Sequence, residues 1–177
     1  MIYTSQELEQ QAILHAAQKI CTAARTAPKA KGLDMLETLV LTGAEKDALA
    51  DRMDDLAEPF GYGFFHRDAD CVRKADAIVL FGTKQAHRGL GAGCGYCRHK
   101  DCADCAEKGG VCAFDPLDLG IAIGSAAASA MDERIDSRVL FSAGRAALED
   151  NLMGEDVTMA FSLVLSVSGK SPFFDRK

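Results

Sequence analysis

Apolar residues recur at helical spacing near the start of the chain. Thr4 to Glu7 has the pattern S/T-x-x-E, in which a hydroxyl and an acid bond each other's backbone N–H groups at a helix start. Pro28 then ends the helix, because proline disfavours helical geometry in the residue before it. The apolar positions between these signals predict one buried helix face: Leu8, Ala12, Ile13, Ala16, Ala17, Ile20 and Ala24.

Two short apolar runs predict strands. Residues 36–42 are rich in aliphatic and β-branched side chains, and they precede a helix predicted over residues 44–58, which Pro59 and Gly61 end. Residues 77–82 are almost uniformly apolar, which is typical of a central strand covered on both faces.

The C-terminal half begins with a strong helix signal. Asp115 is expected to cap the helix, with Pro116 at the first helical position and Asp118 in the first turn. Gly120 and Gly124 each cost about 1 kcal/mol relative to alanine in a helix, so a close packing partner is expected to offset them. A further helix is predicted over residues 142–150 and a strand over residues 157–168.

Strands that alternate with helices predict an α+β (mixed α/β) fold, with a sheet flanked by helices. No internal repeat or linker divides the chain, so residues 1–177 are expected to form a single domain.

Composition excludes several classes of function. A formal net charge of -6, no tryptophan and only three tyrosines argue against a nucleic-acid surface, which needs clustered cations and stacking rings. The longest weakly polar run, residues 119–131, is shorter than the roughly 20 residues that cross a bilayer. The first residues have no signal-peptide pattern, so we expect the reducing cytoplasm.

Five of the seven cysteines lie in the pattern C-x2-C-x4-C-x2-C-x6-C, within residues 89–112, which we call the cysteine segment. A chain of this length folds without disulfides, so a thiol cluster in a reducing compartment favours metal binding. Four of the five thiols are expected to be ligands, with Cys112 in reserve: Cys94, Cys97, Cys102, Cys105 and Cys112.

The spacing leaves the occupant open. It matches neither the ferredoxin pattern nor a zinc ribbon, and the alternatives are an iron–sulfur cluster, favoured as 4Fe–4S, a structural zinc ion, or a metal-free thiol loop. His99 is a further nitrogen ligand candidate. Cys21 and Cys71 are expected to be buried as small apolar residues.

Several segments together resemble a family of prokaryotic proteins that are described as containing a ferredoxin domain. Besides the cysteine segment, the resemblance rests on residues 23–32, 67–69, 112–114, 118–126, 136–138 and 170–176. It spans nearly the whole chain and implies an iron–sulfur cluster.

The order of elements also resembles the flavin-dependent nitroreductases. Ala27-Pro28, the strand at 36–42, the small-residue helix at 119–130 and the strand at 157–168 carry this similarity. It implies a nitroreductase-like central sheet flanked by helices, with the cysteine segment inserted as a loop, in a homodimer that shares FMN sites. The chain departs from the pattern in its neutral and acidic start, which lacks arginines, and in the missing asparagine after Ala27-Pro28.

Cations along the chain are candidates for a flavin phosphate. Arg25, Lys29 and Lys31 lie in one basic stretch, and Lys170 and Arg176 lie in the tail; the alternative is that the stretch is only a solvated loop. Ion pairs are expected at Arg67–Asp68 and at Asp136–Arg138.

These patterns support three hypotheses. The first is an iron–sulfur protein that passes electrons to a redox partner, a bound flavin or a small-molecule acceptor. The second is a structural zinc-binding interaction module, and the third is a nitroreductase-like flavin oxidoreductase. The chain has no local Ser-His-Asp or Cys-His signature and no phosphate-binding P-loop.

Overall fold

The structure is a computed structural model that describes residues 1–174. Arg176, one of the cations predicted to bind a phosphate, lies outside the described residues. The elements follow one another in the order α1 (Ser5–Thr26), η1 (Ala30–Gly32), β1 (Leu36–Thr42), α2 (Gly43–Phe60), α3 (Phe64–Lys74), β2 (Ala77–Lys84), η2 (Gly91–Gly93), α4 (Cys102–Glu107), α5 (Phe114–Asp132), β3 (Asp136–Leu140), α6 (Phe141–Glu149) and β4 (Val157–Ser166).

Four strands form one antiparallel sheet in the order β1-β2-β4-β3. Strand β2 lies inside the sheet, between β1 and β4, and its first seven residues are buried. Its side chains alternate between two apolar cores: Ile78 and Leu80 belong to one core, and Val79 and Phe81 belong to the other. The prediction of a strand covered on both faces is therefore confirmed.

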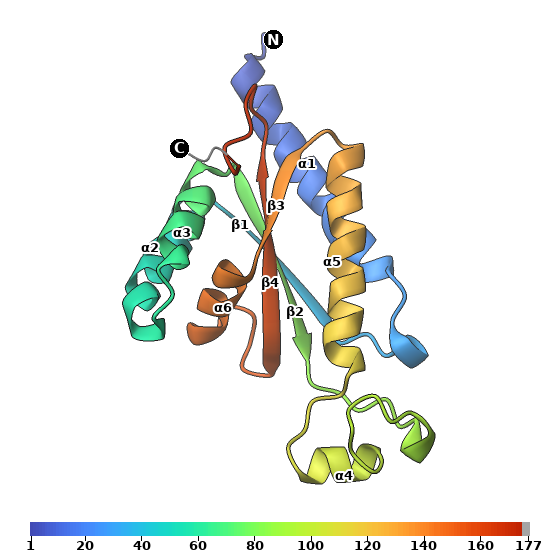
Figure 1. Cartoon of the computed structure of the whole chain (residues 1–177). Helices are drawn as coiled ribbons and strands as arrows, with labels where there is room; N and C mark the ends of the chain where they lie inside the picture. The colour runs from blue at the N-terminus through green and yellow to red at the C-terminus, as the bar shows by residue number, and fades with distance from the viewer. Residues whose placement is uncertain (175–177) are drawn as a thin grey trace.

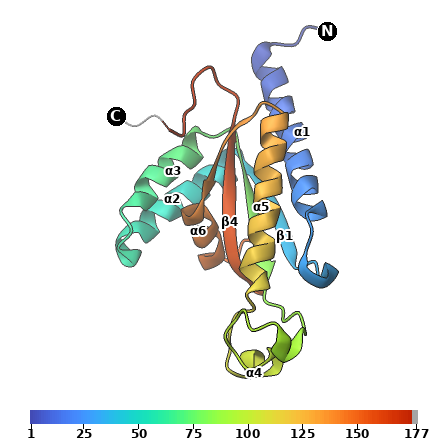
Figure 2. The ribbon, with the colours of Figure 1, turned by 45° about the vertical axis from the view of Figure 1, so that its right-hand side comes forward.

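Helices cover both faces of the sheet, as Figures 1 and 2 show. Helices α1 and α5 pack together over one face, and α2, α3 and α6 cover the other. The predicted α+β arrangement, a central sheet flanked by helices, is confirmed. No helix within residues 1–174 is long and apolar enough to cross a membrane.

Helix α1 begins as its sequence predicts. The backbone N–H of Thr4 donates to the Glu7 carboxylate over 2.8 Å, and the N–H of Glu7 donates to the Thr4 hydroxyl over 3.3 Å. The predicted buried face holds from Ile13 onward, but Leu8 and Ala12 are exposed. The first turns of α1 extend beyond the end of the sheet, where no layer of the chain covers them (Figure 1).

The expected cap of α5 is wrong. The helix begins at Phe114 with Ala113 as the N-cap residue, and no side chain caps it. Asp115 lies inside the first turn, and its carboxylate instead accepts hydrogen bonds from the Ala86 N–H and the Arg88 guanidinium. The Asp115 carboxylate therefore bonds to residues distant in the sequence, and not to the start of its own helix as the local pattern predicted.

Three elements were absent from the expectation: α3, β3 and α4. In α3 the apolar stripe is short, and it shares its buried side with Asp68, which accepts a hydrogen bond from the Ser142 hydroxyl over 2.7 Å. The predicted pair of Arg67 with Asp68 is present at 2.8 Å. Arg138 also lies near Asp68, at 4.0 Å, and donates to the Phe173 carbonyl over 2.6 Å.

Candidate functional site

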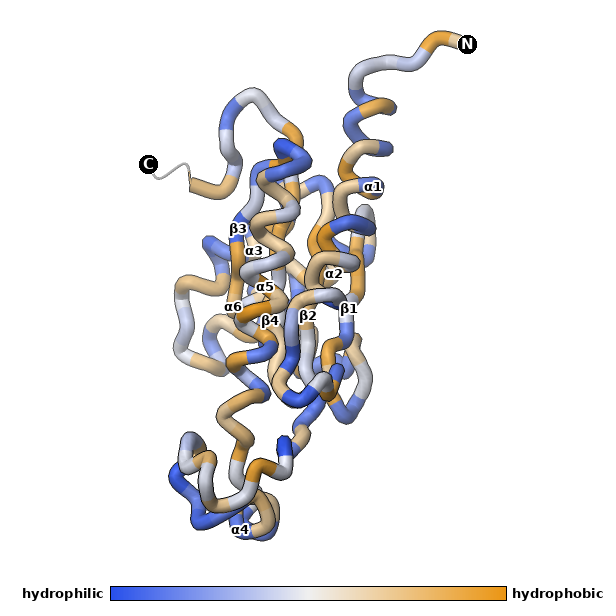
Figure 3. The backbone as a smooth tube through the Cα atoms, turned by 90° about the vertical axis from the view of Figure 1, so that its right-hand side faces the viewer, coloured by the Kyte–Doolittle hydropathy of each residue, from blue (hydrophilic) through white to orange (hydrophobic). Residues whose placement is uncertain are grey.

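The cysteine segment connects β2 to α5 and projects from one end of the sheet (Figures 1 and 2). Figure 3 shows the cysteine segment as a separate small lobe of mixed hydropathy. Within the lobe, η2 and the short helix α4 are the regular elements. The remainder is held by turns and by hydrogen bonds of side chains to backbone.

All five cysteines of the segment line one pocket: Cys94, Cys97, Cys102, Cys105 and Cys112. Cys105 and Cys112 are buried, whereas the other three are half-buried. The seven cysteines of the chain are all among the described residues, and all are free thiols. The structure therefore brings together the residues that the spacing indicated as ligands.

The thiols are close enough to affect one another. The pKa of the Cys105 thiol is raised to about 11, mainly by burial and then by its hydrogen bond with Cys97 and by the charges of Cys97, Cys112 and Cys102. A thiolate at Cys105 therefore needs a compensating positive charge nearby. A bound metal provides such a charge, because it deprotonates the thiols that coordinate it.

Acidic side chains order the outer part of the lobe. The Asp101 carboxylate caps α4 by accepting from the Asp104 N–H over 2.9 Å, and Asp104 accepts from the Lys100 N–H over 3.0 Å. His99, which the sequence offered as a nitrogen ligand, also lines the pocket, and its Nδ1 lies 3.4 Å from the same Asp104 carboxylate.

Gly110 allows Cys105 to sit where it does. A Cβ atom at position 110 would lie 2.9 Å from the Cys105 Sγ and 2.6 Å from the His99 Nε2, closer than such atoms pack. The Gly110 carbonyl accepts from the Gln85 side chain over 2.9 Å, which ties this turn to the end of β2. The backbone at Gly110 thus packs directly against Cys105 and His99, which both line the pocket.

A buried ion-pair network joins the lobe to the sheet and its helices. Arg88 is 2% exposed, and its two Nη atoms donate to Asp115 over 2.9 Å and to Asp118 over 2.8 Å. Asp118 also accepts from the Ala30 N–H over 3.0 Å, which links α5 to the loop before β1. Sequence reasoning missed Arg88, because a single arginine in a polar stretch carries no signal of burial.

The charge of Arg88 is retained despite its burial. Desolvation acts to lower the pKa of the guanidinium, but the hydrogen bond and charge of Asp118 and the charge of Asp115 outweigh it and raise the pKa. Removing one member of such a buried network leaves an uncompensated charge, which is strongly unfavourable. The network therefore fixes the entrance of the cysteine segment against α5.

Residues 1–174 contain no group of three or more His, Cys, Asp or Glu side chains placed to hold a single metal ion. Four thiolates bound to zinc at about 2.3 Å each would have to lie within about 4 Å of one another. The five thiols therefore line one pocket without forming a ready site for a single metal ion in this structure.

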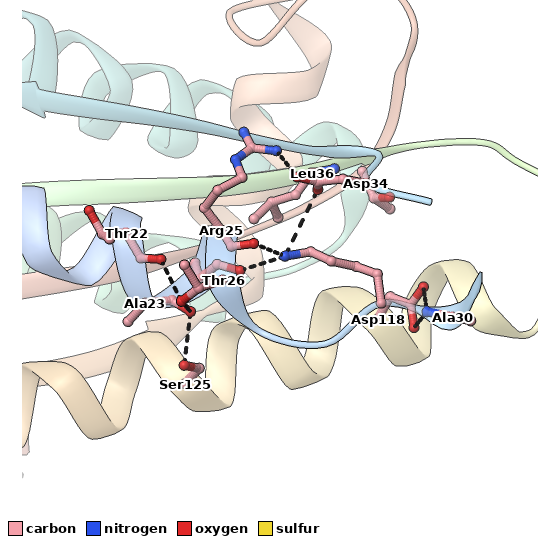
Figure 4. A network of polar contacts seen from close by, with 12 residues as sticks. Thr22, Ala23, Arg25, Thr26, Ala30, Asp34, Leu36, Asp118 and Ser125 are labelled. Carbon is pink, nitrogen blue, oxygen red and sulfur yellow. Dashed lines mark hydrogen bonds and ion pairs between the residues drawn. The ribbon is translucent and has the colours of Figure 1, made fainter. Parts of the chain in front are cut away.

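The basic stretch before β1 is already occupied by contacts within the chain. The Lys29 ammonium donates to the carbonyls of Ala24, over 2.8 Å, and of Arg25, and so caps the end of α1. Arg25 pairs with Asp34 at 2.8 Å, and Figure 4 shows this pair beside the contact of Asp118 with Ala30. These contacts give both cations a structural role.

Among residues 1–174, the predicted phosphate-binding cations do not all lie at one end of the sheet. Lys31 reaches toward the start of the cysteine segment, where its Nζ lies 3.8 Å from the Cβ position of Gly89. Lys170 follows β4 at the opposite end of the sheet, because Leu165 of β4 pairs with Ala77 at the start of β2. A strand of seven residues separates the two ends, which is roughly 20 Å. Their role at a flavin phosphate stays a prediction.

The comparisons with known proteins identify the family. A family model described as "Uncharacterized protein containing a ferredoxin domain (DUF2148)" matches residues 108–176. A protein of Archaeoglobus fulgidus with the name "Uncharacterized protein" is 36% identical over 184 residues, which cover 99% of this chain and 98% of the relative. The chain belongs to the DUF2148 family. The part matched by the family model includes Cys112, α5 and β4, so the resemblance expected from the sequence is confirmed.

Solved structures show that this DUF2148 protein has the nitroreductase fold. Nitroreductase CinD from Lactococcus lactis, solved with nicotinic acid, superposes with a TM-score of 0.61 over 98% of this chain and 86% of that one, at 16% identity. A nitroreductase with bound FMN from Desulfitobacterium hafniense gives a TM-score of 0.60 at 14% identity, over 96% of this chain and 81% of that one. At these identities the similarity establishes the fold alone.

Proposed function

We propose that this DUF2148 protein is an iron–sulfur redox protein, and that the pocket of the cysteine segment holds a 4Fe–4S cluster. The observation that carries the proposal is that all five thiols of one short segment line one pocket. The raised pKa of Cys105 adds to it, because thiols this close favour the ionised form only beside a positively charged group. The family's ferredoxin description supports the same chemistry.

We assign the four ligand positions to Cys97, Cys102, Cys105 and Cys112. Cys105 and Cys112 are the buried thiols of the segment, and Cys97, Cys112 and Cys102 lie close enough to Cys105 to raise its pKa. This differs from the order expected from spacing, in which Cys112 was the reserve. Cys94 then becomes the fifth thiol, at the half-buried edge of the site.

The lobe suits electron exchange at a surface. When bound, a 4Fe–4S cluster supplies one-electron transfer. The half-buried thiols Cys94, Cys97 and Cys102 leave one side of the pocket near solvent, where a redox partner or a small-molecule acceptor can approach. On the inner side, Arg88 with Asp115 and Asp118 holds the segment in position.

Metal analysis of protein purified without oxygen tests this function. We expect about four iron and four sulfide per chain, a brown absorption band, and an EPR signal on reduction. Zinc near one per chain without iron would instead establish the structural zinc module. Protein that binds neither metal, even after reconstitution with iron and sulfide, would refute the proposal.

A flavin oxidoreductase is the second candidate, because solved proteins of the same fold hold FMN. The described cations fit this less well within one chain, since Lys29 and Arg25 are engaged in the chain's own contacts and Lys170 lies at the other end of the sheet. Heat-released yellow fluorescence, measured on the purified protein, decides this point. Equimolar FMN would favour the flavin enzyme.

We also propose that the protein is a homodimer that pairs through the outward face of α5. Leu117, Ile121 and Met131 are 49%, 38% and 72% exposed, and a Cβ atom added at Gly120 or Gly124 would meet no atom of another described element within 4 Å. The packing partner expected for these glycines is therefore absent from the described chain, and a second copy would supply it. Ile121→Glu should yield monomer in light scattering, whereas Leu152→Glu, also at an exposed site, should not.

A further inference from the structure

Two buried nitrogen atoms at the entrance of the cysteine segment have no hydrogen-bond partner. They are the Nε2 of His87 and the Nε of Arg88, on consecutive residues that both line the cysteine pocket. Among residues 1–174 only two other buried side-chain polar atoms lack a partner, and these belong to Asp136 and Ser171, outside the pocket lining. Unsatisfied donors are thus concentrated beside the five thiols.

An unpaired buried donor is costly, about 1–3 kcal/mol, so such atoms are expected to have a partner in the functional protein. Arg88 leaves only its Nε free, because its Nη atoms donate to Asp115, Asp118 and the Ala86 carbonyl. These bonds hold the guanidinium in place, at 2% exposure. The guanidinium is thus held in a fixed position, and both unpartnered nitrogens belong to residues that line the pocket together with the thiols.

We propose that His87 Nε2 and Arg88 Nε donate hydrogen bonds to sulfur atoms of the cluster that the cysteines hold, and that they raise its reduction potential. This inference rests on the proposed function. The neutral imidazole donates from Nε2 when the proton resides there. Reduction adds one negative charge to the cluster and its sulfurs, so donors aimed at those sulfurs stabilise the reduced form more than the oxidised form.

The first experiment replaces the imidazole donor and measures the potential. Wild type, His87→Leu, His87→Gln and the exposed-site control His15→Leu are reconstituted and titrated by EPR at one pH. We expect His87→Leu to lower the equilibrium constant for reduction about tenfold, which is about 59 mV for one electron. His87→Gln keeps an N–H donor and should recover part of the loss, and His15→Leu should match wild type.

The main measurement of the second experiment is made on the wild-type protein, so it does not depend on whether a variant binds the cluster. Wild-type protein labelled with 15N-histidine, then with 15N-arginine, is reduced and studied by pulsed EPR. We expect a weak 15N coupling from each label, and the histidine coupling should vanish in His87→Gln and persist in His99→Gln. Absence of both couplings, or a strong histidine coupling that signals direct ligation to iron, would overturn the inference.

The outcomes separate the two proposals. A wild-type protein that cannot be loaded with iron refutes the proposed function, and the inference falls with it. A fully loaded His87→Leu variant with an unchanged potential refutes the inference alone, and indicates that water satisfies these donors.

Discussion

Two loops lie at the same end of the sheet, and they use their polar side chains in opposite ways. Residues 27–35 precede β1, and the cysteine segment follows β2, whose end pairs with the start of β1. In the first loop Lys29 is bonded to backbone carbonyls, and Asp34 pairs with Arg25 in the last turn of α1. In the second, five thiols line a pocket together with His87, which lies just before the segment and whose buried Nε2 has no partner.

The difference separates residues that stabilise the fold through partners within the chain from residues that we propose bind a cluster. Both loops appeared in the sequence as dense sets of chemically active side chains. In the first loop, the chain itself supplies the partners of Lys29 and Arg25, so these cations stabilise a helix end and a turn. In the second, burial and neighbouring thiols disfavour a Cys105 thiolate unless a positive charge lies nearby, whereas the unpaired nitrogens of His87 and Arg88 have no acceptor within the described chain.

The largest effect is expected from the thiols themselves. Cys105→Ser should lose most of the iron, because it removes a buried ligand that lies close to the other thiols of the segment. Cys94→Ser is the matched control within the same segment and should retain most of it. Iron and sulfide analysis after identical reconstitution measures the difference. Equal iron in both variants would refute our choice of ligands.

Among the changes that test the fold around the site, Arg88→Met should lower the free energy of unfolding most. It leaves Asp115 and Asp118 as uncompensated buried charges, at a cost of about 3–5 kcal/mol. Arg52→Met breaks an exposed pair with Asp150 and should cost no more than about 1 kcal/mol. Urea unfolding of the metal-free proteins provides the comparison. Similar costs would contradict the anchoring role of Arg88.

Lys29→Met tests whether the first loop is only structural. The variant loses charged hydrogen bonds to the last carbonyls of α1, each worth about 1.5–3 kcal/mol. We expect a lower free energy of unfolding with unchanged cluster and flavin content. Loss of a bound flavin with unchanged stability would show that Lys29 holds a phosphate, and would remove the contrast between the loops.

Gly110→Ala tests how tightly the second loop is built. The added methyl group would press on Cys105 and His99, with an overpacking cost of about 1–3 kcal/mol and weaker cluster retention. Gly93→Ala is the control in the same segment, because its added Cβ atom would have no neighbour within 4 Å. It should change neither the free energy of unfolding nor cluster retention appreciably. Unfolding midpoints and the rate of iron release measure both effects. Identical behaviour of the two variants would contradict the close packing of Gly110 against Cys105 and His99.

The smallest effect is expected for Arg25→Leu, below about 1 kcal/mol, since the pair with Asp34 is exposed. Burial acts to raise the pKa of Asp34, but the hydrogen bond and charge of Arg25 outweigh it and lower the pKa below its usual range. The stabilisation is therefore present at neutral pH and is lost as the pH falls through the folded-state pKa. Stability curves of variant and wild type should converge in acid; a constant gap would contradict this.

Local patterns predicted most of the framework for identifiable reasons. The capping box of Thr4 and Glu7 and the apolar run of β2 depend on neighbours in the sequence, so they were readable in advance. Helix α3 was missed because its short apolar stripe includes Asp68, whose burial depends on Ser142, 74 residues away. Strand β3 has half-buried and exposed side chains over most of its length and gave no clear alternation.

The sequence by itself determined most of the helices and strands, the resemblance to the family, and the five thiols of the candidate site, because cysteine spacing and hydrophobic period are local properties. Only the tertiary structure decided that Cys112 stands with the inner thiols, that Arg88 is buried between Asp115 and Asp118, and that His87 faces the same pocket. These relations depend on where β2 delivers the segment against α5. Burial and charge pairing across such distances arise from packing, and they leave no periodic trace in the chain.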